Sequence, residues 1–111
     1  MLLDMKPIET YEALKAAVGA LGWARPGSLT RRLMPCGKRS CRCMRKPPVL
    51  HGPYYQWTRR MNGRTKTMRL TAKQARLCRG WERNHRHLKS LVARIERLSL
   101  RETDRVLRTT L

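Results

Sequence analysis

Acidic residues are scarce in this sequence, and the middle of the chain has none. The 111 residues include 7 Asp and Glu against 26 Lys and Arg, and no acid occurs between Glu12 and Glu82. A two-metal nuclease needs several carboxylates at one site, and a catalytic zinc needs a general base beside an open ligand position. The few acids lie towards the two ends of the chain, so we expect a protein that is not an enzyme.

Long apolar runs are also missing. No stretch approaches the length of a transmembrane helix. Residues 1–7 lack the apolar run and the small-residue cleavage site of a secretory signal. We therefore expect a cytoplasmic protein without a membrane partner, in a reducing compartment where clustered cysteines more often bind metal than form disulfides.

Positive charge is what the sequence has in excess. The formal net charge is +19 and the sequence pI about 11.5, which favours a polyanionic partner. A solvated tail or a membrane-surface segment is the alternative for such a charge run. The basic block contains Tyr54, Tyr55 and Trp57 together with turn residues, so we favour a folded surface that binds nucleic acid.

Three of the four cysteines lie close together and are followed by a histidine. Cys36, Cys41, Cys43 and His51 form the pattern C-x4-C-x-C-x7-H, a Cys3His set typical of closed tetrahedral zinc sites. Three free thiols with an incidental histidine are the alternative, and a redox pair is disfavoured because the C-x-x-C spacing is missing. We expect a structural Zn²⁺, with His85 as the fourth ligand if His51 is not one.

The flanking sequence predicts an α+β fold in one small domain. Residues 8–21 have an amphipathic helical pattern, with Tyr11, Leu14, Ala17, Val18 and Leu21 on one face. Residues 28–34 can form a short strand. Residues 35–53 are rich in Pro and Gly and predict an irregular zinc knuckle.

A β-hairpin is predicted around Asn62-Gly63, the strongest short signal for a two-residue turn. Its strands should cover residues 54–61 and 64–70, with residues 28–34 able to extend them to a three-stranded sheet. The turn sets the expected pairs, which are Met61 with Arg64, Arg60 with Thr65, Arg59 with Lys66, Thr58 with Thr67, Trp57 with Met68, Gln56 with Arg69 and Tyr55 with Leu70.

A long basic amphipathic helix should follow the hairpin. Thr71 and Gln74 have the spacing of a capping box, and an apolar stripe then comprises Leu77, Trp81, Leu88, Leu91, Ile95 and Leu98. We expect Leu77 and Trp81 to pack on the rest of the domain and Cys78 to be a buried small residue. The part after Leu88 can pair with a partner or a second copy.

These elements divide the chain into three segments. Residues 1–25 form the N-terminal helix and linker, residues 26–70 the zinc knuckle with the hairpin, and residues 71–111 the long helix.

The motif PGS…CGKxxCxC…HGPY resembles that of a family of small, basic, uncharacterised bacterial and archaeal proteins. The residues that carry the resemblance are Pro26-Gly27-Ser28, Cys36-Gly37-Lys38, Cys41-Arg42-Cys43 and His51-Gly52-Pro53-Tyr54. The resemblance covers about residues 26–98, supports His51 as a ligand and implies a loose association with mobile elements.

We expect a nucleic-acid-binding zinc protein that serves as an accessory or regulatory factor of a mobile element or nucleoprotein complex. The residues expected to contact phosphates are Arg31, Arg32, Lys38, Arg39, Arg42, Arg45, Lys46, Arg59, Arg60, Arg64, Lys66 and Arg69. The mobile-element resemblance favours DNA over RNA. The alternatives are an RNA-binding component of a ribonucleoprotein, or a subunit whose long helix pairs with a larger recombinase or nuclease.

Overall fold

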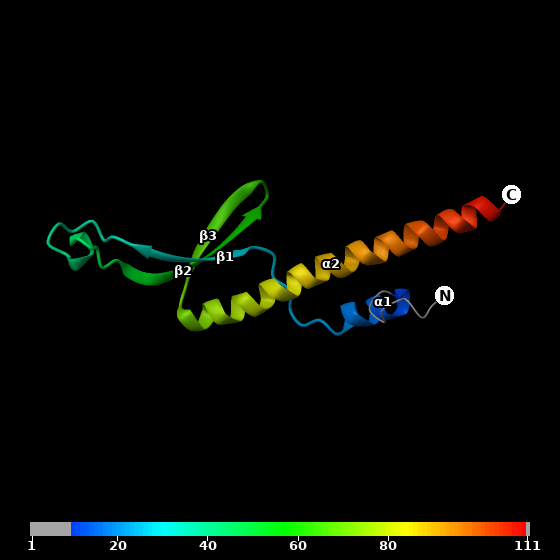
Figure 1. Cartoon of the computed structure of the whole chain (residues 1–111), viewed down its shortest axis with the longest axis horizontal. Helices are drawn as coiled ribbons and strands as arrows, with labels where there is room; N and C mark the ends of the chain where they lie inside the picture. Colours follow the sequence, from blue (N-terminus) through cyan, green and yellow to red (C-terminus); the bar gives the residue numbers. More distant parts are fainter. Residues whose placement is uncertain (1–9, 111) are drawn as a thin grey trace. The chain divides into compact units, whose positions relative to one another are not determined.

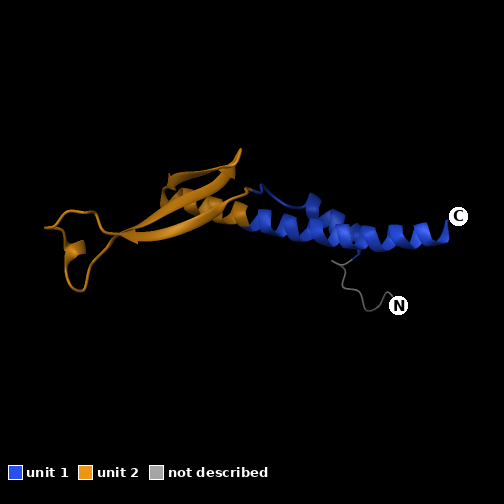
Figure 2. Cartoon of the chain, turned by 90° about the horizontal axis from the view of Figure 1, so that it is seen from above, with its two compact units in different colours: residues 1–24, 83–111 blue, residues 25–82 orange. Residues whose placement is uncertain are grey.

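The computed structural model describes residues 10–110 (Figure 1). In chain order these residues form α1 (Tyr11–Gly19), β1 (Ser28–Met34), the 3₁₀ turn η3 (Arg42–Met44), β2 (His51–Met61), β3 (Arg64–Leu70) and α2 (Ala72–Thr109). The expected α+β class is confirmed. The chain forms two compact units (Figure 2): unit 1 joins the described residues up to Ala24 with those from Arg83 onward, and unit 2 is Arg25–Glu82.

Unit 2 is built on a three-stranded antiparallel sheet in the order β1-β2-β3. All seven residue pairs expected across the β2–β3 hairpin are confirmed. Asn62 and Gly63 have positive φ angles of 52° and 77°, which a two-residue type I′ turn requires at both central positions. The turn therefore determines which face of the sheet each side chain joins.

One face of the sheet carries the core of unit 2. Trp57, Leu70, Ala75 and Cys78 are buried together, and Leu29, Tyr55 and Trp81 pack against them. The expectations for Cys78 and Trp81 are confirmed. Leu77 is 50% exposed, so the expectation that it packs into the core is wrong; the helix turns Ala75 and Cys78 towards the sheet instead.

At Gly27 the backbone lies directly against this core. A Cβ atom added to Gly27 would lie 2.6 Å from the Trp57 ring, and its φ of +143° is one that other residues rarely adopt. A glycine before β1 therefore allows Trp57 to be covered by backbone.

The start of β2 differs from the expectation. The strand begins at His51 rather than Tyr54, and the register shifts between the pairs Arg32↔Tyr54 and Met34↔His51. The extra residue lies on β2, where Gly52 has a φ of +124° and a Cβ atom would approach the Arg32 carbonyl oxygen to 2.8 Å. Gly52 and the bulge allow the strand to continue through Pro53, which has no N–H to donate.

Unit 1 consists of α1 and the residues of α2 from Arg83 onward. Thr10 caps α1 by accepting a hydrogen bond from the Ala13 N–H. Helix α1 ends at Gly19, two residues before the expected end, and the expected residues 8 and 9 lie outside the described part of the chain. Leu14 and Leu91 are fully buried.

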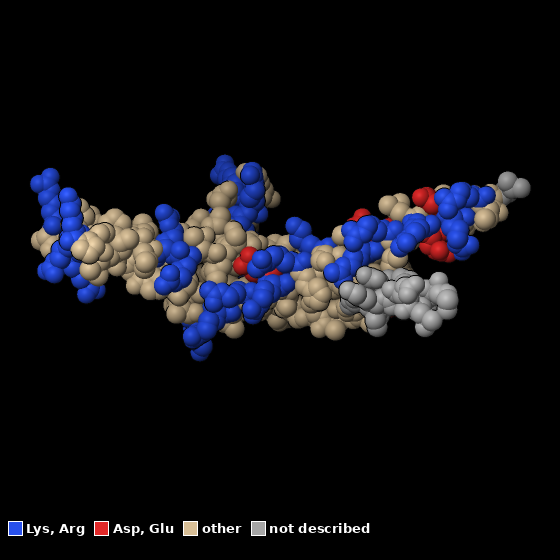
Figure 3. All heavy atoms as spheres, viewed as in Figure 1, with Lys and Arg blue, Asp and Glu red and all other residues tan. Residues whose placement is uncertain are grey.

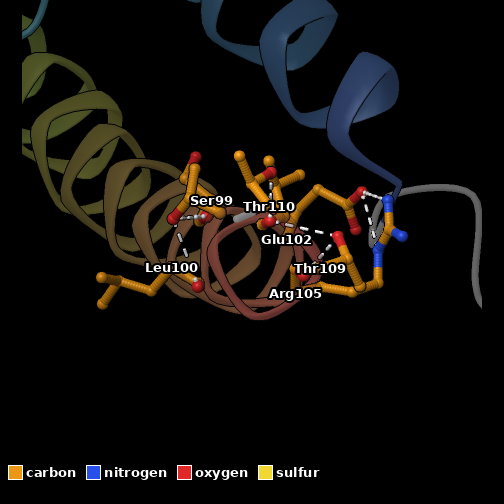
Figure 4. Close-up of polar contacts among 8 residues, drawn as sticks. Ser99, Leu100, Glu102, Arg105, Thr109 and Thr110 are labelled. Atoms are coloured by element: carbon orange, nitrogen blue, oxygen red, sulfur yellow. Dashed lines mark hydrogen bonds and ion pairs between the residues drawn. The ribbon is translucent and has the colours of Figure 1, made fainter.

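Helix α2 begins with the expected capping box and is 38 residues long. The Thr71 N–H donates to Gln74 Oε1 at 2.9 Å, and the Gln74 N–H donates to Thr71 Oγ1 at 3.1 Å. Its last turns are held by side-chain contacts along the helix (Figure 4): the Thr103 hydroxyl donates to the Ser99 carbonyl, and Arg105 pairs with Glu102. The last turns are exposed and carry these polar contacts beside apolar side chains such as Leu107.

Candidate metal centre and basic surface

The loop between β1 and β2 brings the four predicted metal ligands together. Because Met34 pairs with His51, the two ends of the loop lie side by side at the end of the β1–β2 ladder. The turn η3 then folds the middle of the loop back and carries Cys43, which is only 2% exposed. Cys36 and Cys43, which are seven residues apart in the sequence, are thereby placed beside each other.

The four ligand atoms all lie within 4.8 Å of one another. Cys36 Sγ is 3.6 Å from Cys43 Sγ, and Cys41 Sγ is 3.0 Å from His51 Nε2. A tetrahedral metal with sulfur ligands at 2.3 Å has ligand atoms roughly 3.5–3.8 Å apart. The distance between Cys36 and Cys43 lies in this range, and Cys36, Cys41, Cys43 and His51 are positioned to bind a metal ion.

Hydrogen bonds within the loop favour the charged form of one thiol. The pKa of Cys41 is lowered to about 6, first by the backbone N–H of Cys43 and then by the side chains of Cys36 and His51. The pKa of Cys43 is raised: the backbone N–H of Cys36 lowers it, but burial and the neighbouring Cys36 and Cys41 thiols outweigh that effect. A thiol must be deprotonated to bind a metal, and the lowered pKa of Cys41 favours that form.

The other candidates for a ligand are not part of this cluster. His85 lies on α2 and is not needed as the fourth ligand, because His51 is in place. Cys78 is buried in the core of unit 2. Within residues 10–110, Cys36, Cys41, Cys43 and His51 are the one group of three or more His, Cys, Asp or Glu side chains that could hold a metal.

The predicted phosphate-contacting residues all lie in unit 2. Eleven of the twelve are exposed, and Arg59 is half-buried. All of them except Arg69 fall into three groups: Arg31 and Arg32 on β1, a loop cluster and a hairpin tip. The loop cluster comprises Lys38, Arg39, Arg42, Arg45 and Lys46, and the cations of the hairpin tip (residues 59–66) are Arg59, Arg60, Arg64 and Lys66; Arg69 lies further along β3.

Figure 3 shows these groups as separate patches. On the face shown, blue Lys and Arg atoms gather at the end of the loop and at the tip of the hairpin without red atoms among them, whereas along α2 blue atoms and the few red acidic atoms are interspersed. The loop and hairpin patches are not neutralised by acids from their own segment, because no acid occurs between Glu12 and Glu82.

The three aromatic side chains of β2 have different surroundings. Trp57 is only 2% exposed, and Tyr55 packs against the core cluster. Tyr54 lies on the opposite face, where the Arg69 guanidinium stands 4.8 Å from the centre of its ring. Trp57 is therefore a core residue, and Tyr54 is the one of the three that faces away from the core.

The residues named from the sequence omit three exposed cations of the same unit. Lys73, Arg76 and Arg79 follow one another at intervals of three on the first turns of α2 and are all exposed. This spacing places them along one side of the helix and could have indicated a fourth basic group.

No described helix is both long enough and apolar enough to cross a membrane.

A family model described as "Domain of unknown function (DUF6788)" matches residues 8–79. The match contains the four clustered ligands, the whole sheet and the first turns of α2, whereas residues 80–111 lie beyond it. It begins earlier and ends earlier than the segment of about 26–98 that carries the motif resemblance. Neither the curated proteins nor the solved structures gave a match.

Proposed function

The chain belongs to this family of domains of unknown function, and we propose that it binds nucleic acid through a basic surface held in shape by a structural Zn²⁺. The observation that carries the proposal is the uncompensated positive charge of unit 2. Except for the half-buried Arg25 and Arg59, its cations are exposed on the sheet, the loop and the first turns of α2, and its one acidic residue, Glu82, lies at its end. A phosphate backbone is the polyanion that such a surface fits best.

Zinc is the metal that the donor set favours. Three thiolates and one imidazole, here within 4.8 Å of one another, are the donor set typical of closed structural zinc sites. Lys38, Arg39 and Arg42 lie between the cysteines in the sequence and would offset the net negative charge of three thiolates around one dication. The ion would join the ends of a loop that has no regular structure except η3.

Metal analysis of the purified protein tests the zinc site. We expect about one Zn²⁺ per chain, and a His51→Ala variant should lose most of it because His51 supplies the one nitrogen of the set. A His51→Ala protein that keeps its full zinc content would place the fourth ligand elsewhere.

The sheet face opposite the core supports the nucleic-acid proposal. This face carries Tyr54, Arg32, Arg69 and Arg60, interspersed with Thr and Gln side chains. Hydroxyl, amide and guanidinium groups are the donors that most often contact phosphate and sugar. A sheet face of this composition suits a wet, polar interface better than it suits a protein core.

Binding measured over a salt series tests the function. The logarithm of the association constant for a labelled nucleic acid should fall linearly with the logarithm of the salt concentration, losing on the order of 10³-fold between about 50 and 200 mM if several phosphates are contacted. Polyglutamate serves as a control polyanion without sugar or bases. Binding that does not change with salt would contradict the proposal.

The biological role belongs to the same proposal. We propose an accessory or regulatory factor of a mobile element or nucleoprotein complex, supported by the motif resemblance alone. Sequencing the nucleic acid that co-purifies with the protein tests it. Enrichment of one structured RNA would instead indicate a ribonucleoprotein component.

A second function is favoured by exposed apolar side chains on the later part of α2. Val92, Leu100, Val106 and Leu107 are between 42% and 70% exposed. An interaction subunit that pairs this helix with a larger recombinase or nuclease, or with a second copy, would cover them. The charge-neutral double variant Leu100→Gln/Leu107→Gln should then lose its partner, or its self-association in sedimentation, and keep its affinity for nucleic acid.

A further inference from the structure

The hairpin tip is a two-stranded ribbon. Strand β1 pairs with β2 only as far as Ser28↔Thr58, whereas the β2–β3 ladder continues to Met61↔Arg64. Residues 59–61 and 64–66 therefore have each other as their only strand partners among the described residues. The ribbon extends beyond the three-stranded part of the sheet and beyond the core at Trp57.

Cations occupy both faces of this ribbon. Arg60 lies on one face, and Arg59, Arg64 and Lys66 lie on the other, as their pairing shows. Arg60, Arg64 and Lys66 are exposed. The Arg60 guanidinium donates to the Gly63 carbonyl at 3.2 Å, which holds this arginine close to the turn.

We propose that the hairpin tip enters the major groove of duplex DNA; this inference rests on the proposed nucleic-acid function. The major groove of B-DNA is about 12 Å wide and admits a two-stranded ribbon, and Arg and Lys there meet the O6 and N7 acceptors of guanine. The major groove of A-form RNA is too narrow and deep for side chains to read. The shape of the tip thus selects the DNA duplex.

Strand β2 connects the hairpin tip to a second basic group, the loop cluster. It runs from His51 in the metal-ligand cluster to Met61 at the tip and is 11 residues long. At roughly 3.3 Å per residue its ends are at most about 33 Å apart, close to the ~34 Å of one turn of B-DNA. The loop cluster can therefore contact phosphates about one helical turn from the groove that the tip occupies.

The aromatic residues of β2 favour a duplex over a single strand at this sheet. Stacking of unpaired bases requires exposed ring faces. Trp57 is 2% exposed, Tyr55 packs on the core and the Tyr54 ring has Arg69 against it. The aromatic side chains of β2 thus do not form an open stacking platform.

Groove-specific blocking of a labelled DNA duplex tests the proposal with the full chain. Glucosylated 5-hydroxymethylcytosine fills the major groove and should weaken binding about tenfold or more, because contacts to base edges are lost. Netropsin, which fills the minor groove, should change the affinity much less. An RNA duplex and a single strand of the same sequence should bind more weakly than the DNA duplex at equal salt.

Two triple variants of equal charge make the test specific to the tip. Arg60→Gln/Arg64→Gln/Lys66→Gln alters only exposed side chains of the ribbon, and Arg97→Gln/Arg101→Gln/Arg108→Gln removes the same charge from exposed positions of α2. The tip variant should lose both affinity and the sensitivity to glucosylation, with unchanged zinc content. The α2 variant should keep that sensitivity.

The outcomes separate this inference from the function on which it rests. Absence of salt-dependent binding to every nucleic acid overturns the proposed function. Salt-dependent binding that is indifferent to glucosylation, or equally strong on the RNA duplex or the single strand, leaves the function standing and overturns the major-groove inference.

Discussion

The two compact units carry their positive charge in different ways. In unit 1 the cations are interspersed with Glu12, Glu96, Glu102 and Asp104, and two of these acids form ion pairs along a helix, Glu12 with Lys15 and Glu102 with Arg105. In unit 2 the cations extend from Arg25 to Arg79 without an acid among them. Charge that the chain neutralises itself needs no partner, whereas the charge of unit 2 favours an external polyanion.

The units also differ in what holds their backbone in place. Unit 1 relies on helical hydrogen bonds and on buried leucines such as Leu14 and Leu91. Unit 2 combines a small core around Trp57 with a loop whose clustered cysteines and histidine are suited to a metal. The segment matched by the family model contains nearly all of unit 2 and ends in the first turns of α2. The match also contains α1, so the family's shared segment comprises the first helix, the loop, the sheet and the start of α2.

Removing one metal ligand should give the largest difference in stability between the two units. Cys41→Ser is expected to abolish zinc binding and to release the loop, since apparent zinc-binding energies on the order of 10 kcal/mol are available to fold such sites. Hydrogen exchange should accelerate around residues 34–51, and residues 84–108 of α2 should keep their protection. Cys78→Ser, which changes a cysteine outside the cluster, should retain the metal. Unchanged exchange in the loop of Cys41→Ser would show that the metal does not stabilise it.

Adding a methyl group to one glycine in each unit should have smaller and opposite effects on the stability of the two units. Gly27→Ala should destabilise unit 2 by about 1–3 kcal/mol, because the residue has a positive φ and its Cβ meets the Trp57 ring. Gly19→Ala, with no atom within 4 Å of the new Cβ, should stabilise α1 by up to about 0.5 kcal/mol. Thermal unfolding measures both, and equal shifts for the two variants would contradict the close packing at Gly27.

The features that sequence predicted best are those fixed by local chemistry. The Asn62-Gly63 turn sets the whole β2–β3 register, and the Thr71–Gln74 capping box sets the start of α2. The spacing of the cysteines indicated the metal cluster because few other arrangements place three thiols and an imidazole in one short loop. Each of these signals lies within sixteen residues or fewer of sequence.

The features that sequence missed depend on distant contacts. The bulge that starts β2 at His51 depends on how β1 approaches Gly52, and the exposure of Leu77 depends on which side of α2 faces the sheet. Helical periodicity identifies an apolar stripe but not where its boundary falls. The separation of the cations into a loop cluster and a hairpin tip likewise follows from the direction of β2 rather than from composition.

Neutralising one acid of unit 1 should give the smallest effect and is the most direct check on the charge comparison. The neighbouring Arg105, by hydrogen bonding and by its charge, lowers the pKa of Glu102 below 4.5. The pair therefore contributes stability that is present above pH 4.5 and is lost as the pH falls through the lower pKa of the folded state.

Glu102→Gln should slightly reduce the stability of α2 at neutral pH and low salt. The difference should disappear in acid, where Glu102 is protonated, and in high salt, because both partners are exposed. Circular dichroism across a pH and salt series measures this change in stability. The affinity for nucleic acid should rise slightly, since one more cation of unit 1 is left uncompensated. A fall in affinity would contradict the view that Glu102 offsets positive charge which attracts nucleic acid.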